Sequence, residues 1–147
     1  MAFCLGGGGA ALLDQFYADP ATLPPAGGGD VLQGRVTQVR DGDTIEVRGV
    51  AVRLEGLHAP ELDDLGGLAA QRFMERHAFG QTVRCDLSGD SSYDRMIGVC
   101  FSAGADIADA LVLAGLGRDC PRYSGGRYRS LETTEGRLLE LPGYCLR

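Results

Sequence analysis

The sequence predicts a mainly β domain with about three helices, in which five strands close into a barrel. Short runs of alternating β-branched residues indicate three strands early in the chain, an amphipathic helix follows them, and two more strands come after the helix. This order, with the helix between the third and fourth strands, is that of the OB-fold. With 147 residues, the chain can form one modest core but not two.

The first strand is predicted over residues 31–39, and the next two form a hairpin. The runs 44–47 and 50–54 are separated only by Arg48 and Gly49. Two residues ending in glycine between β-branched runs favour a tight turn.

This hairpin brings residues of opposite charge to one end. Its register places Asp43 and Thr44 opposite the end of the next strand, where Arg53 lies. The chain then leaves the strand, passes through His58 and reaches Glu61. Two carboxylates, an arginine and a histidine are therefore expected to lie close together.

The later elements are predicted from periodicity and capping. They are a helix over 65–79, strands over 82–87 and 96–101 joined by a polar loop over 88–95, and a helix from Asp106 through Ala114. Asp106 is a favoured N-cap, and Gly115 is a favoured left-handed stop. A last helix over 130–139 is only weakly indicated because Gly136 interrupts it.

Residues 1–30 are predicted to form a flexible tail or linker, which leaves 31–147 as the folded domain. Residues 14–30 contain three prolines and three successive glycines. Residues 1–13 are apolar but broken by glycines, too short to span a membrane, and without the basic start of a signal peptide. This stretch is either a trimmed export or anchor segment or a simple tail, and no stable membrane span is expected.

The charge balance limits the kinds of partner. The formal net charge is -6, and all 14 basic residues are arginine. Proteins that coat nucleic acid without regard to sequence usually carry a basic field, which is missing here. Arginine is nevertheless a forked donor suited to phosphate oxygens, and an Arg- and Tyr-rich segment begins at about residue 117.

Four of the five cysteines are predicted to form two disulfides. Cys85 and Cys100 fall in adjacent predicted strands, and Cys120 and Cys145 bracket the C-terminal segment. No spacing fits a zinc site. Disulfides would indicate an oxidising compartment, periplasmic or extracellular; the alternative is isolated buried thiols.

Three blocks of the sequence, in order, carry a family resemblance. They are Val39-Arg40-Asp41-Gly42-Asp43-Thr44 with Val52-Arg53-Leu54 and Ala59-Pro60-Glu61, then Tyr93-Asp94-Arg95, then Leu111-Val112-Leu113-Ala114-Gly115-Leu116. Together they resemble the staphylococcal nuclease-like (thermonuclease) family over about residues 34–123. The resemblance implies an OB-type barrel and phosphodiester hydrolysis that leaves a 3′-phosphate and a 5′-hydroxyl.

The resemblance also implies roles for the matching residues. Arg53 and Arg95 would grip the phosphate, each able to give two parallel hydrogen bonds. Glu61 would act as general base or orient the attacking water. Asp43 and Thr44, together with position 58, would hold a divalent metal, because hard cations prefer oxygen ligands.

Each residue also has a structural alternative. Asp43 could serve simply as a turn-forming residue, because Asp-Gly sequences favour turns. Arg53 could pair with Asp43 or Glu55 inside the sheet. Arg95 could be neutralised by its neighbour Asp94.

Two positions depart from the family pattern. His58 stands where the family has an aspartate, and imidazole is a poor ligand for Ca²⁺ but a good one for Mn²⁺, Ni²⁺, Cu²⁺ or Zn²⁺. The site could therefore prefer a softer metal, bind Ca²⁺ or Mg²⁺ weakly through Asp43, or hold no metal and use His58 as acid or base. Asp94, where the family has glycine, would either weaken substrate binding at Arg95 or replace a carboxylate.

Aromatic and basic residues complete the predicted site. Tyr93 and Tyr123 match positions near the bound nucleotide and could stack on bases of single-stranded or frayed DNA, or of RNA. Arg118 and Arg122 could line a nucleic-acid groove; the alternative is a solvated or disulfide-held tail.

These observations predict a metal-assisted nuclease that is secreted or periplasmic. The alternative is a barrel of the same fold that binds nucleic acid or a protein without cutting.

Overall fold

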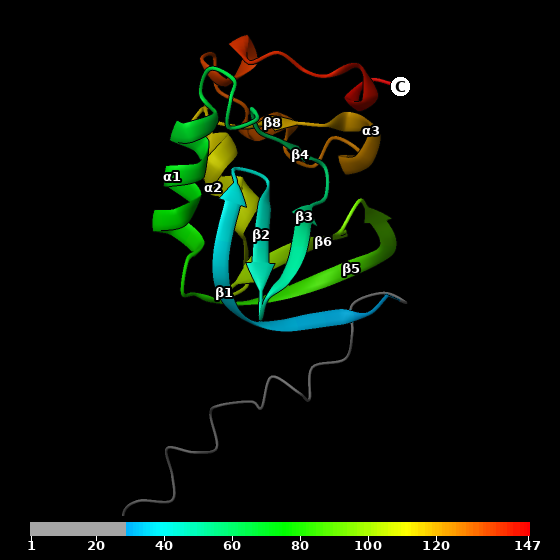
Figure 1. The fold of residues 1–147 in the computed structure, drawn as a ribbon. Coiled ribbons are helices and arrows are strands. Elements are labelled where there is room, and N and C mark those ends of the chain that lie inside the picture. Colours follow the sequence, from blue (N-terminus) through cyan, green and yellow to red (C-terminus); the bar gives the residue numbers. More distant parts are fainter. Residues whose placement is uncertain (1–28) are drawn as a thin grey trace, which may run out of the picture.

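The computed structural model describes residues 29–147. The predicted tail over residues 1–30 therefore lies almost wholly outside the described residues. Figure 1 shows a barrel with a long helix along one side and the C-terminal segment lying across one end.

Five long strands form the barrel: β1 (Val31–Asp41), β2 (Thr44–Val47), β3 (Val50–Leu54), β5 (Thr82–Ser92) and β6 (Arg95–Ser102). Their order is β3-β2-β1-β5-β6 with antiparallel neighbours, and β3 also pairs with β6 in parallel, which closes the sheet. The short strand β7 (Ala105–Asp106) pairs beside β6. The mainly β, OB-type barrel predicted from the sequence is confirmed.

The β2–β3 hairpin has the predicted register. Thr44 pairs with Arg53 and Val47 with Val50. Arg48 and Gly49 have φ values of 52° and 79°, and a two-residue turn with both central φ angles positive matches the twist of the flanking strands.

The domain has three helices, the number expected: α1 (Gly67–Ala78), α2 (Ile107–Leu113) and the single turn α3 (Pro121–Ser124). The first two match predicted helices, whereas α3 was not predicted. Asp106 caps α2, because its Oδ1 accepts a hydrogen bond of 2.9 Å from the Ala108 N–H. Gly115 ends this helix with φ 74°. Both cap predictions are confirmed.

Two predicted elements differ from the structure. Much of the expected loop over 88–95 belongs to strands. After Leu87 the register between β5 and β6 shifts, and Ser91 then pairs with Met96. β5 therefore continues to Ser92, and its last residues form an exposed, polar hairpin with β6 that backbone hydrogen bonds hold together. The weak helix over 130–139 is instead two short 3₁₀ helices, η2 (Arg129–Leu131) and η3 (Gly136–Leu138). The Thr133 hydroxyl accepts the Gly136 N–H and starts a separate turn there.

A pairing that the sequence did not indicate fixes the C-terminal segment over the barrel. β4 (Leu57–His58) pairs with β8 (Arg118–Asp119). Figure 1 shows both strands above the end of β3, beneath the C-terminal segment. The last element, η4 (Gly143–Cys145), contacts α3.

Both predicted disulfides are present, Cys85–Cys100 and Cys120–Cys145. Cys85 and Cys100 face each other across β5 and β6 and belong to the barrel core. The largest side chains in this core are Ile45, Leu54, Leu57, Met74, Leu111 and Tyr128. No helix within residues 29–147 has the length and apolar character needed to cross a membrane.

Candidate active site

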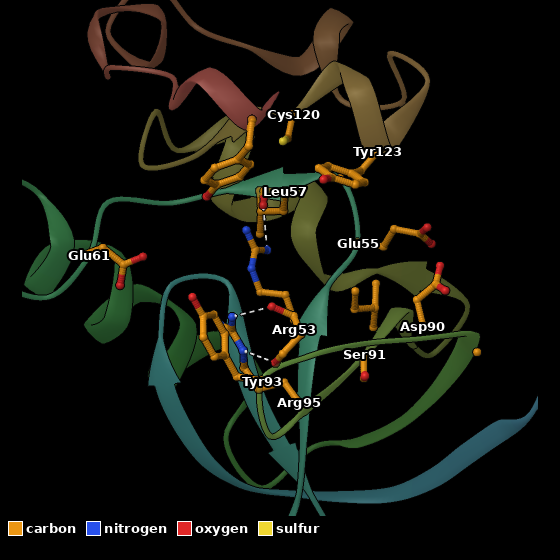
Figure 2. A pocket seen from close by; sticks show the side chains of 15 residues that line it. Arg53, Glu55, Leu57, Glu61, Asp90, Ser91, Tyr93, Arg95, Cys120 and Tyr123 are labelled. Atoms are coloured by element: carbon orange, nitrogen blue, oxygen red, sulfur yellow. Dashed lines mark hydrogen bonds between the residues drawn. The ribbon is translucent and has the colours of Figure 1, made fainter. Parts of the chain in front are cut away.

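A pocket of about 830 Å³ opens between the end of β3, the β5–β6 hairpin and the C-terminal segment. Its wall contains five residues that the sequence predicted to act: Arg53, Glu61, Tyr93, Arg95 and Tyr123. Figure 2 shows them around one space although they come from four separate parts of the chain. The structure thus brings the predicted catalytic and stacking residues together.

A chain of hydrogen bonds joins the two arginines behind this wall. Arg95 Nη1 donates to the Thr44 hydroxyl at 3.2 Å, and that hydroxyl donates to Asp43 Oδ1 at 3.2 Å. The other oxygen of Asp43 lies 3.1 Å from Arg53 Nη2. Because Asp43 and Thr44 are buried, this network fixes the two guanidinium groups relative to each other.

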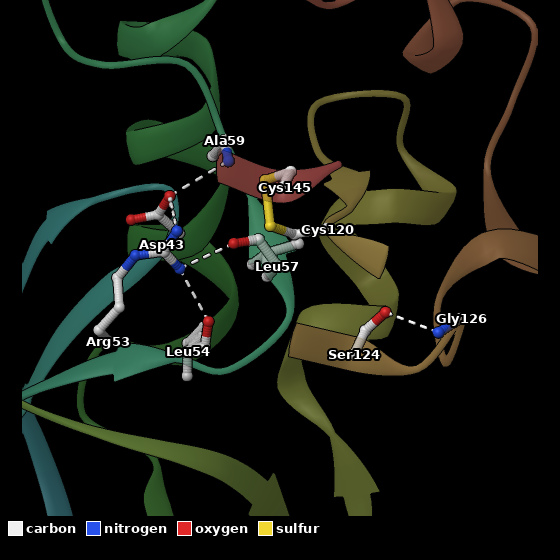
Figure 3. Close-up of a disulfide and its surroundings, with 9 residues drawn as sticks. All are labelled: Asp43, Arg53, Leu54, Leu57, Ala59, Cys120, Ser124, Gly126 and Cys145. Carbon is white, nitrogen blue, oxygen red and sulfur yellow. Dashed lines mark hydrogen bonds and ion pairs between the residues drawn. A yellow bond between two sulfur atoms is a disulfide. The ribbon is translucent and has the colours of Figure 1, made fainter. Parts of the chain in front are cut away.

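Arg53 is held by the backbone as well as by Asp43. Its Nη1 donates to the carbonyls of Leu54 at 2.8 Å and Leu57 at 2.7 Å (Figure 3). These bonds and the Asp43 contact use three of the five N–H groups of a guanidinium. Two N–H groups remain for a ligand in the pocket.

Arg95 is positioned by its own hairpin. Nε donates to the Ser92 carbonyl at 3.2 Å and Nη2 to the Ser92 hydroxyl at 3.0 Å (Figure 2). The guanidinium also lies over the Tyr93 ring, 5.8 Å from its centroid. The Tyr93 ring and the hydrogen bonds to Ser92 thus hold the Arg95 guanidinium in the pocket wall, although the side chain is only partly buried.

Asp94 does not neutralise Arg95 by direct pairing. Its carboxylate pairs instead with Arg40 at 2.9 Å, and Arg40 also pairs with Glu46 at 2.8 Å. The hydrogen bond from Arg40 lowers the pKa of Asp94. The residue that departs from the family pattern is thus engaged away from the predicted phosphate site.

Glu61 is exposed and is placed by its backbone. The Glu61 carbonyl accepts a hydrogen bond of 2.9 Å from the Asp64 N–H. Gly67, at the start of α1, packs against the same carbonyl so closely that a Cβ at residue 67 would overlap it. Within residues 29–147 the Glu61 carboxylate forms no hydrogen bond or ion pair. It is therefore available to accept a proton from water.

Asp41 lies next to the network and forms an acidic pair with Asp43. The Asp43 N–H donates to Asp41 Oδ1 at 3.0 Å. Burial, together with the negative charge of Asp43, raises the pKa of Asp41 to about 6. Asp41 therefore keeps its proton to higher pH than an ordinary aspartate.

The surroundings of Asp43 bear on the predicted metal site. Within residues 29–147 no group of three or more His, Cys, Asp or Glu side chains could hold a metal ion. The two oxygens of Asp43 already face Arg53, the Thr44 hydroxyl and the Ala59 N–H, which donates at 3.2 Å. Asp43 and Thr44 as metal ligands therefore stay predictions that this arrangement does not favour.

His58 lies outside the pocket wall. It is 9% exposed and stands opposite Arg118 in the β4–β8 pair. Burial and the positive charge of Arg53 lower its pKa, and its buried Nδ1 has no hydrogen-bond partner within the described residues. Ligation or proton transfer by His58 stays a prediction.

The two predicted groove arginines differ in their surroundings. Arg118 is tied to the C-terminal segment, with Nε 2.8 Å from Glu132 and Nη1 donating to the Leu139 carbonyl at 2.9 Å. Arg122 lies over the Tyr123 ring, 5.3 Å from its centroid. Arg118 thus holds the segment in place, whereas Arg122 supports a ring of the pocket wall.

Tyr144 is a pocket residue that sequence reasoning missed. It follows Tyr123 by 21 positions, in a segment without clear periodicity. The signal that could have found it is the Cys120–Cys145 pair, since a disulfide there must bring residue 144 close to α3.

Comparison with known proteins gives two relatives. Over 121 residues the chain is 31% identical to the succinoglycan biosynthesis protein ExoI of Rhizobium meliloti (strain 1021), covering 74% of this chain and 63% of that protein. Over 89 residues it is 34% identical to an uncharacterized endonuclease of Escherichia coli O157:H7, covering 57% of this chain and 58% of that protein. No protein-family model matches the chain. The chain is thus similar to a protein named as an endonuclease, and it spans about three fifths of the length of each relative.

Proposed function

We propose that this protein is a nuclease that hydrolyses phosphodiester bonds of DNA, with RNA as a second substrate. The observation that carries the proposal is the placement of Arg53, Arg95 and Glu61 in the wall of one pocket, with the arginines linked through Thr44 and Asp43. The similarity to a protein named as an endonuclease supports it.

The proposed mechanism assigns one task to each group. The free N–H groups of Arg53 and Arg95 neutralise the charge that grows on the phosphate oxygens in the transition state. Glu61, whose carboxylate has no partner within the described residues, accepts a proton from the attacking water. Tyr93 and Tyr123 contact the nucleotide. The water oxygen bonds to phosphorus, the P–O5′ bond breaks, and the departing 5′-oxygen takes up a proton from solvent. The expected products therefore carry a 3′-phosphate and a 5′-hydroxyl.

A divalent cation is a separate proposal on which none of these steps depends. It would be held by Asp43 and Thr44, and softer ions such as Mn²⁺ or Ni²⁺ are expected to serve better than Ca²⁺ if His58 takes part. A bound cation would supply further charge neutralisation at the phosphate.

The second candidate function is binding without cleavage. It is favoured by the net charge of -6 and by the engagement of both Asp43 oxygens inside the protein. The same acidity predicts that capture of nucleic acid by either kind of protein is weak and sensitive to salt.

We also propose that the protein works in the periplasm or outside the cell. The support is the pair of disulfides, because such bonds persist mainly in oxidising compartments.

Cleavage of denatured DNA tests the function. The purified protein is incubated in chelator and then with Ca²⁺, Mg²⁺, Mn²⁺ and Ni²⁺ in turn. We expect Glu61→Gln to lower kcat by about 10²- to 10⁴-fold, as loss of a general base does. Glu55→Gln is the matched control, because Glu55 lines the same pocket; it should retain activity. Binding without cleavage under every condition would favour the second candidate.

A His58→Asp variant tests the metal proposal. Gain of Ca²⁺-dependent cleavage would show that the histidine determines metal choice. Unchanged metal dependence would contradict the role given to position 58.

A further inference from the structure

The C-terminal segment adds a second aromatic side chain to the pocket. Tyr144 in η4 lines the pocket together with Tyr123 in α3, and η4 packs on α3. The two side chains are exposed to nearly the same degree, 48% for Tyr144 and 49% for Tyr123. Each ring is therefore supported by protein and still open to a ligand.

The Cys120–Cys145 disulfide fixes Tyr144 beside the arginine site. Cys145 follows Tyr144 directly, and its Cα lies 4.7 Å from that of Cys120. The Cys120 N–H donates to the Gly56 carbonyl at 2.8 Å, and Gly56 follows the strand that carries Arg53. Figure 3 shows this disulfide next to Leu57, whose carbonyl accepts from Arg53.

The chemistry of this wall suits an unpaired nucleobase. A phosphate at Arg53 and Arg95 would carry its nucleotide into the same pocket, where Tyr123 and Tyr144 offer ring faces. The guanidinium of Arg122 already covers one face of Tyr123. A base in a duplex is stacked and paired, so only a single strand or a frayed end can present its face to these rings.

We propose that Tyr144, held in place by the Cys120–Cys145 disulfide, is a substrate-positioning residue that stacks with an unpaired base of the bound strand. This inference rests on the proposed nuclease function and adds to it one more contact with an unpaired base. It makes the C-terminal segment part of the substrate site and not only a cover for the barrel.

Binding of fluorescent single strands, measured by anisotropy in chelator, tests the proposal. The probes are an oligothymidylate and an abasic strand of the same length. Tyr144→Ala should raise the Kd for oligothymidylate by about 5- to 100-fold, the effect of losing one base–aromatic stack. On the abasic strand the same variant should bind like wild type, because no base is present to stack.

Three further variants separate stacking from other effects. Tyr144→Phe keeps the ring and should bind like wild type. Phe79→Ala removes an exposed ring outside this pocket and should change neither Kd. Cys120→Ser combined with Cys145→Ser should weaken oligothymidylate binding, and Tyr144→Ala should add little in that background.

The outcomes distinguish this inference from the function on which it rests. If wild type cuts and binds single strands but Tyr144→Ala binds them equally well, or loses as much affinity on the abasic strand, the base-stacking role is overturned. If wild type neither binds nor cuts any strand, the nuclease proposal itself fails and this role with it.

Discussion

Replacing Arg53 by glutamine should damage the fold as well as the proposed activity. The side chains of Arg53 and Asp43 are only 14% and 5% exposed. Removing one partner of a buried ion pair costs about 3–5 kcal/mol, because the other charge stays buried without compensation. The carbonyls of Leu54 and Leu57 also lose their shared donor.

Arg40→Gln is the matched control for this substitution. Arg40 also pairs with two carboxylates, but its side chain is 35% exposed and that of Asp94 is 68% exposed. Exposed ion pairs of this kind contribute little to stability, because water screens the two charges. The same change of residue should therefore cost several times less at position 40 than at position 53.

The measurement is urea unfolding followed by far-UV circular dichroism, since the chain has no tryptophan to report by fluorescence. We expect the free energy of unfolding to fall by about 3–5 kcal/mol in Arg53→Gln. Adding Asp43→Asn to this variant should restore part of the loss by removing the unpaired charge. Equal losses for Arg53→Gln and Arg40→Gln would refute the buried network.

The remaining predictions concern a glycine and the acidic pair. Gly56 has φ 75° and lies against Ser124, whose Cα would be 2.6 Å from an added Cβ, whereas Gly49 has φ 79° and open space around it. Gly49→Ala should lower the free energy of unfolding by about 1–2 kcal/mol, because only the left-handed backbone is strained. Gly56→Ala should lower it clearly more, because the added Cβ also overlaps Ser124. Equal melting temperatures for the two variants would contradict the close packing of Gly56 on Ser124. The raised pKa of Asp41 means that its contribution to stability is full below about pH 4 and is lost as pH rises through about 6. Asp41→Asn should therefore raise the melting temperature at pH 8 and leave it unchanged at pH 4. An equal change in melting temperature at the two pH values would contradict the raised pKa that burial and the charge of Asp43 give Asp41.

Local sequence signals were enough to predict the barrel and the register that brings Asp43 and Thr44 to Arg53. The Arg48-Gly49 turn fixes the hairpin register, and this register alone places Asp43 and Thr44 beside Arg53. Asp106 and Gly115 mark the ends of α2 for similarly local reasons. In these places the hydrogen bonds and φ angles depend on a few neighbouring residues, so the sequence pattern was sufficient to predict the local structure.

Contacts between distant segments were not accessible in this way. Two-residue strands such as β4 and β8 have too few positions for any periodicity, so their pairing came only with the structure. The pairing of Asp94 with Arg40 spans 54 positions, and nothing in the sequence favoured it over the adjacent Arg95. Tyr144 reaches the pocket only because a disulfide returns the chain to α3.

His58 shows how a matched position can differ in surroundings. Its place in the sequence predicted a metal ligand or a catalytic group, but β4 pairs its backbone with Arg118 and the side chain is buried outside the pocket wall. A motif specifies the order of residues, whereas the neighbours of a side chain depend on which segment covers it.

The most direct test is a crystal structure of the Glu61→Gln variant with a short single-stranded oligonucleotide. The account predicts one phosphate within hydrogen-bonding distance of both Arg53 and Arg95, with residue 61 facing the phosphorus. A strand bound on another face of the barrel, or a phosphate that reaches neither arginine, would contradict it.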